Sequence, residues 1–166
     1  MNPITEEIQK RLISYLNPAN FSVKSMYHYI CGSGSTYFAK KATGLFKEGS
    51  FVESFVVGCG DETEMMVIYK FNSFIDGKDV YLSMGRIIGS CDHCECNRET
   101  NLKEQLENMI SRGHLSFTVE EAFDDMKRRV KGYWDHDLDD LDDVDNLKRE
   151  YLDKLKESEI LGKLYG

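Results

Sequence analysis

Apolar residues at regular helical spacing predict an amphipathic helix at the start of the chain. Asn2 and Pro3 resemble an N-cap and a first helical residue, and an apolar side chain then recurs at every fourth position. These apolar positions are Ile4, Ile8, Leu12 and Leu16. We expect Asn17-Pro18 to end the helix, because the residue before a proline disfavours helical backbone.

Three stretches in the middle of the chain predict β-strands, namely Phe51–Val57, Met65–Phe71 and Val80–Ile88. Asp76-Gly77 is typical of a tight turn, although these strand ends leave a loop longer than two residues. Consecutive strands with short connections usually pair, so we expect an antiparallel meander. Its expected core residues are Ile68, Val80, Leu82 and Ile88.

The second half of the chain predicts three helices. The first spans about Glu99–Ser111, and Gly113 stops it. The second opens at a capping box that begins at Thr118, and Gly132 breaks it. Its apolar positions are Phe123, Met126 and Val130, and those of the first helix are Leu102, Leu106, Met109 and Ile110. The third is amphipathic, with Leu138, Leu141, Val144, Leu147, Tyr151 and Leu155 at spacings of three and four.

The predicted fold class is therefore α+β. We expect an antiparallel β-meander packed with helices, plus a C-terminal amphipathic acidic helix. The expected division is a globular domain at residues 1–131 and an acidic helical segment at residues 132–166. No apolar run is long enough to span a membrane, so no membrane partner is expected.

The net charge of −8 is concentrated in one short segment, DHDLDDLDDVD at residues 135–145. Without the seven aspartates of this segment, the chain has 22 acidic and 21 basic residues, a net charge of −1. A near-neutral body argues against direct nucleic-acid binding, which usually needs a basic surface. The seven aspartates are Asp135, Asp137, Asp139, Asp140, Asp142, Asp143 and Asp145.

Three interpretations of this aspartate run compete. A calcium loop that starts at Asp135 would place Asp140 where an EF-hand needs glycine, and Asn146 where it needs glutamate. A solvated helix face is the second interpretation, but the helix dipole favours acidic residues only in the first turn. The third is a surface that binds a basic protein, such as a nucleic-acid-binding protein. The apolar stripe at Leu138, Leu141, Val144 and Tyr151 is a further candidate, for docking to a larger assembly.

Three of the five cysteines lie within six residues, in the sequence Cys-Asp-His-Cys-Glu-Cys. Thiolates in a C-x-x-C pair are ligands that zinc prefers, so the sequence offers a zinc site as an alternative function. The candidate ligands are Cys91, Cys94, Cys96 and Cys59. A redox C-x-x-C lacks the usual βαβ context, and cysteines packed in a compact corner are the simplest interpretation.

This loop resembles that of small bacterial and phage proteins of no established activity. Their signature is Gly-Ser-Cys-Ser-Gly-Cys-Asp after an aromatic strand, and Gly89, Ser90, Cys91 and Cys94 match it here. Glu95 takes the place of the family's aspartate. Two substitutions and one addition depart from the signature, namely Asp92, His93 and Cys96. The resemblance covers about residues 57–131 and implies a local fold and a bacterial or phage source, but no reaction.

The sequence predicts a binding protein and not an enzyme. None of the four histidines has a nucleophile and a carboxylate at a recognisable spacing, and no G-x-S-x-G motif occurs. The odd cysteine count and the absence of a secretion signal predict a cytoplasmic location. The expected function is that of an accessory or inhibitory factor whose acidic helix engages a basic partner protein, with no cofactor unless zinc is bound.

Overall fold

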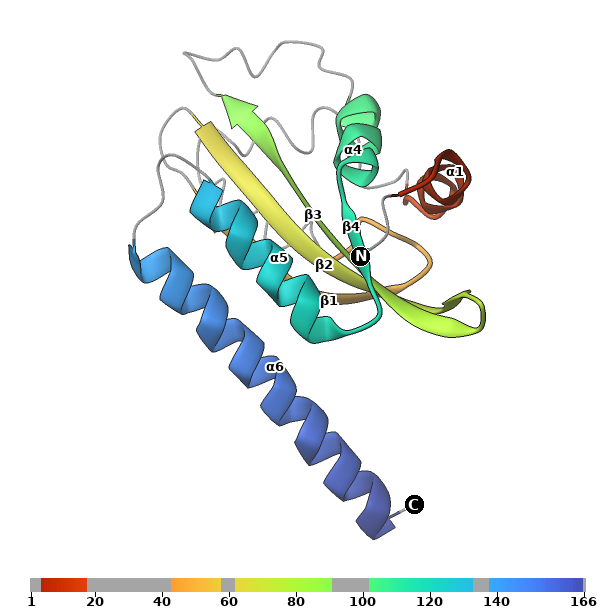
Figure 1. The fold of residues 1–166 in the computed structure, drawn as a ribbon, viewed down its shortest axis with the longest axis vertical. Helices are drawn as coiled ribbons and strands as arrows, with labels where there is room; N and C mark the ends of the chain where they lie inside the picture. The colour runs from red at the N-terminus through yellow and green to blue at the C-terminus, as the bar shows by residue number, and fades with distance from the viewer. Residues whose placement is uncertain (1–3, 18–42, 58–61, 91–101, 133–137, 166) are drawn as a thin grey trace.

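The four strands of the computed structural model form one antiparallel sheet in the order β1-β2-β3-β4 (Figure 1). The structure describes residues 4–17, 43–57, 62–90, 102–132 and 138–165. The strands are β1 (Ser50–Val57), β2 (Glu62–Ile75), β3 (Lys78–Ser90) and β4 (His114–Ser116). The helices are α1 (Glu6–Ser14), α4 (Leu102–Ser111), α5 (Val119–Gly132) and α6 (Leu138–Tyr165). The predicted α+β class, with a C-terminal helix, is confirmed.

The hairpin between β2 and β3 is tighter than the sequence predicted. Ile75 pairs with Lys78, so the turn consists of Asp76 and Gly77 alone. Their φ angles are 52° and 72°, the left-handed values that both central residues of a type I′ turn require. The expectation of a longer loop was wrong because the pairing is irregular between Phe71 and Ile75, where the alternation in the sequence is interrupted.

The two faces of the sheet are covered by different pairs of helices. Alternate residues of the central strand β2 point to opposite faces, and both sets are fully buried. Met65, Val67 and Tyr69 pack with α1 and α4, whereas Met66 and Ile68 pack with α5 and α6. The predicted core residues Ile68, Val80 and Leu82 are buried, and the side chain of Ile88 lies outside the described residues.

The first helix begins later than the sequence predicted. Thr5 is the N-cap of α1, and its hydroxyl accepts a hydrogen bond from the backbone N–H of Ile8 at 3.2 Å. Two acidic residues follow in the first turn, where the helix dipole favours them. The assignment of Asn2 and Pro3 as the helix start was therefore wrong, and both lie outside the described residues.

A fourth strand was missed in the sequence. His114, directly after the predicted helix end at Gly113, lies in β4 and pairs with Ser83 of β3. A strand of three residues is too short to show an alternating pattern. Gly113 allows the chain to approach β3 closely, because a Cβ atom there would lie 2.8 Å from Cδ1 of Leu82.

Helix α5 forms where the sequence predicted it. Thr118 caps the helix, and its hydroxyl accepts a hydrogen bond from the backbone N–H of Glu121 at 3.3 Å. The predicted apolar residues Phe123, Met126 and Val130 are all buried. This helix therefore covers one face of the sheet, and α6 lies alongside it (Figure 1).

Candidate functional site

Helix α6 packs on the body of the protein along its first half only. Val144 is 1% exposed, and Leu141, Leu147, Tyr151 and Leu152 are partly buried in the same core as α5. The rings of Tyr151 and Phe123 lie 5.9 Å apart. The chain therefore covers Leu141, Val144 and Tyr151 itself, and the expectation that they dock to a larger assembly was wrong. The side chain of Leu138 lies outside the described residues.

Two ion pairs of opposite direction connect α5 and α6. Nζ of Lys127 on α5 lies 2.7 Å from Oδ2 of Asp145, and Nζ of Lys148 on α6 lies 3.1 Å from Oδ1 of Asp124. The hydrogen bond to Asp145 raises the pKa of Lys127 above its ordinary value. Exposed pairs stabilise a fold only slightly, but their crossed arrangement favours one alignment of the two helices.

The structure divides the aspartate run that the sequence singled out. Asp139, Asp142 and Asp143 are exposed, Asp140 is partly buried, and Asp145 is held by Lys127. Asp135 and Asp137 lie outside the described residues. The described aspartates of the run therefore differ in exposure and in contacts.

The exposed aspartates belong to a longer stripe along α6. We call it the outer acidic stripe: its positions lie alternately four and three residues apart, and every one is exposed. At 3.6 residues per turn, this spacing keeps them on one side of the helix, opposite Val144. Asp142 adjoins the stripe, and the guanidinium of Arg149 donates a hydrogen bond to Oδ1 of Asn146 within it. The stripe consists of Asp139, Asp143, Asn146, Glu150, Asp153 and Glu157.

Three of these acidic residues were missed in the sequence. Glu150, Asp153 and Glu157 lie beyond residue 145, among lysines and arginines that conceal them in a linear count of charge. Their three- and four-residue spacing, out of phase with the apolar stripe, is the signal that reveals them.

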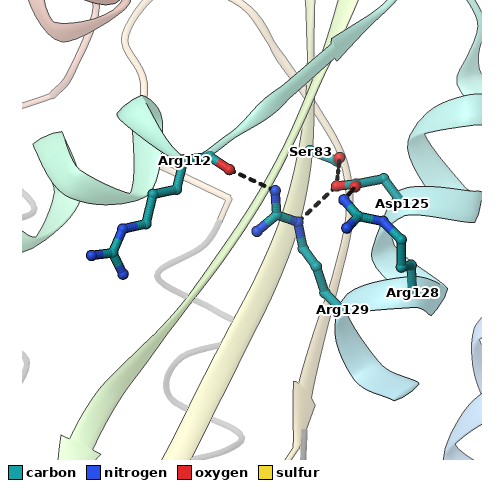
Figure 2. A network of polar contacts seen from close by, with 5 residues as sticks. All are labelled: Ser83, Arg112, Asp125, Arg128 and Arg129. Atoms are coloured by element: carbon teal, nitrogen blue, oxygen red, sulfur yellow. Dashed lines mark hydrogen bonds and ion pairs between the residues drawn. The ribbon is translucent and has the colours of Figure 1, made fainter. Parts of the chain in front are cut away.

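A second polar cluster is buried between α5 and the sheet, as Figure 2 shows. The carboxylate of Asp125 is 3% exposed and accepts hydrogen bonds from the Ser83 hydroxyl and the Arg128 guanidinium. Nε of Arg129 donates to the same carboxylate at 2.7 Å. Nη2 of Arg129 also donates to the backbone carbonyl of Arg112 at 2.7 Å, so the cluster joins α5, β3 and the α4–β4 connection.

The electrostatics of this cluster point to a structural role. Burial would raise the pKa of Asp125, but the hydrogen bonds from Ser83 and Arg129 and the charge of Arg129 hold it below its usual value. A carboxylate stabilised in this way is a weak base, and a buried Ser83 cannot reach a substrate. The sequence offered a signal for it: an aspartate beside an apolar stripe, with arginines three and four positions later.

The predicted zinc ligands Cys59, Cys91, Cys94 and Cys96 all lie outside the described residues. Within the described ranges, no group of three or more His, Cys, Asp or Glu side chains is placed to hold a metal ion. The zinc hypothesis stays a prediction.

Comparisons with protein-family models, with curated proteins and with solved structures find no match to this chain. The resemblance at the cysteine loop therefore stays a prediction as well. Among the helices of the described segments, none combines the length and apolar character needed to cross a membrane. The outer acidic stripe is the candidate functional site that the geometry defines.

Proposed function

We propose that this chain is a non-enzymatic accessory or inhibitory factor that binds a basic partner protein through the outer acidic stripe of α6. The observation that carries the proposal is the row of exposed carboxylates from Asp139 to Glu157, on the side of α6 opposite the buried Val144. The opposite side of the same helix is buried against α5.

The packing of α6 favours recognition of a partner by this row. The buried Val144 and the two ion pairs hold the first half of α6 on α5. The carboxylates of Asp139 and Asp143 are therefore presented in a fixed geometry. Neighbours three or four positions apart on a helix lie about 5–6 Å apart. A regular row of negative charge attracts a cationic groove and accelerates encounter with it.

The cost of the arrangement also supports a binding role. Asp139 and Asp143 are four residues apart, and like charges at this spacing destabilise a helix. The helix dipole offsets this repulsion only within the first turn. Attraction to a cationic partner would compensate for repulsion that the isolated helix does not relieve.

A photo-cross-linking residue at Asn146 tests the proposal directly, because this position lies within the stripe and carries no charge. We expect irradiation in native cell extract to attach a basic protein, identified by mass spectrometry. Titration of the purified partner should then give a dissociation constant that rises steeply as salt is added, because salt screens the attraction between the charges.

The charge requirement is tested with the triple variant Asp139→Asn, Asp142→Asn and Asp143→Asn. The matched control replaces three exposed glutamates elsewhere, Glu7, Glu48 and Glu121, by glutamine, and so changes the net charge equally. We expect affinity to fall about tenfold or more for the stripe variant alone. Equal loss in both variants, or in neither, would contradict the proposal.

A further inference from the structure

The second half of α6 extends beyond α5 and the sheet (Figure 1). This half carries an unusual concentration of exposed apolar side chains. The described residues have five exposed large apolar side chains, and four of them lie here. They are Leu155, Ile160, Leu161 and Leu164, with exposed fractions of 38%, 58%, 53% and 70%. A cluster of this kind is typical of a docking surface.

Two of these residues continue the outer acidic stripe. Ile160 follows Glu157 by three positions and Leu164 follows Ile160 by four, so the alternating spacing is unbroken. The side of α6 that faces outward is therefore acidic along most of its length and apolar at its C-terminal end. Leu161 lies beside this end, whereas Leu155 lies on the side of the helix that carries Val144 and Tyr151.

We propose that the occupant of this surface is a basic amphipathic α-helix of the partner protein. The proposal rests on the proposed function and adds a second contact to it. Lysine or arginine side chains of the partner face the acidic stripe, and apolar side chains pack on Ile160 and Leu164. The unbroken spacing of alternately three and four residues is the spacing at which one helix packs along another.

Charge complementarity favours a basic helix over a second copy of this chain and over an anionic lipid surface. A second copy of α6 paired along the stripe would bring Glu150 and Asp153 close to the same acidic residues of the other copy, and like charges repel. An anionic lipid surface would be repelled for the same reason. An antiparallel helix with its basic residues toward its own C-terminus is also favoured by its helix dipole.

A synthetic helical peptide is the probe. It carries leucine at its first two stripe positions and lysine at the following six, spaced alternately three and four residues apart. A control peptide of the same composition places the two leucines on the opposite side of its helix. Fluorescence anisotropy measures the affinity of each peptide for the full chain. We expect the control peptide to bind about tenfold or more weakly.

The matched protein variants are Ile160→Ser with Leu164→Ser, and Leu155→Ser alone as the control on the same projecting segment. We expect the double variant to lose about 10- to 100-fold in affinity for the probe, and the control to bind as the wild type does. Equal affinity for both peptides, or equal loss in both variants, would overturn the inference. Wild-type dimers that the double variant abolishes would overturn it in favour of a second copy.

The proposed function is judged separately by the cross-link at Asn146 and the triple aspartate variant. One outcome is that the triple aspartate variant loses the natural partner while the variant at Ile160 and Leu164 retains it. In that case the acidic stripe binds the partner without the apolar end of the helix, and only the further inference fails. If neither loses it, both proposals fail.

Discussion

Aspartates occur in two contrasting settings in this molecule, in the buried cluster beneath α5 and on the outer side of α6. Asp125 is almost completely buried and accepts hydrogen bonds from Ser83, Arg128 and Arg129. Asp139 and Asp143 are exposed on the outer acidic stripe. The same side chain therefore contributes to the fold in one place and to the charge of the surface in the other.

This contrast shows that a conspicuous sequence feature need not be important for stability. The aspartate run dominates any plot of charge along the chain, yet Asp139, Asp142 and Asp143 are exposed, and the ion pair of Asp145 with Lys127 lies at the surface. Asp125 is a single acidic residue among ordinary neighbours, but it joins a helix to the sheet. Burial, which the sequence shows only indirectly, decides the energetic role.

The largest effect is expected from Asp125→Ala. The substitution leaves Arg129, whose side chain is 17% exposed, without its carboxylate partner. We expect the free energy of unfolding to fall by about 3–5 kcal/mol, measured by urea denaturation. Ser83→Ala is the matched control, because it removes one donor and keeps the ion pair, and it should cost about 1 kcal/mol. Equal costs for the two variants would contradict the role assigned to Asp125.

Acid should remove the contribution of Asp125 selectively. Hydrogen bonds and the nearby charge of Arg129 lower the folded-state pKa of Asp125, so its stabilising contribution is present above its unfolded pKa of about 4. The contribution is lost as the pH falls through the folded-state pKa. We expect the difference in unfolding free energy between wild type and Asp125→Asn to be constant near neutrality and to shrink below about pH 4. A difference that does not change with pH would contradict this account.

The smallest effect on stability is expected from neutralising the outer acidic stripe. Replacing Asp139, Asp143 and Asp153 by asparagine, and Glu150 and Glu157 by glutamine, removes exposed charges only. Thermal unfolding should shift by an amount corresponding to no more than about 0.5 kcal/mol in either direction. A loss comparable to that of Asp125→Ala would mean that the stripe is structural, and the contrast between the two regions would disappear.

The sequence predicted elements with strong periodicity well. The faces of α5 and of the β2–β3 pair follow from regular apolar spacing, and Ile68, Leu82 and Phe123 are buried as expected. The local sequence pattern did not predict strand β4 or the tight turn at Asp76, because tertiary contacts determine both. Strand β4 forms by pairing with β3 directly after the close approach of Gly113 to Leu82, and the turn at Asp76 is tight because β2 continues past its own irregularity.

The candidate site was predicted only in part. The charge count identified Asp139, Asp142 and Asp143 but not Glu150 or Glu157, because neighbouring lysines cancel the charge of the latter in a linear sum. Nor could charge alone show that Asp145 faces Lys127, since this depends on how α6 lies on α5. The phase of a helix relative to its support is a tertiary property.

The crossed pairs between α5 and α6 also determine the reach of the molecule. If α6 slid by one turn in one direction, Lys127 would face Arg149 and Asp124 would face Leu152; in the other direction they would face Leu141 and Val144. Either displacement moves the free tip of the helix by about 5.4 Å and costs both attractions. These two surface ion pairs therefore help to determine how far the second half of α6 projects beyond α5.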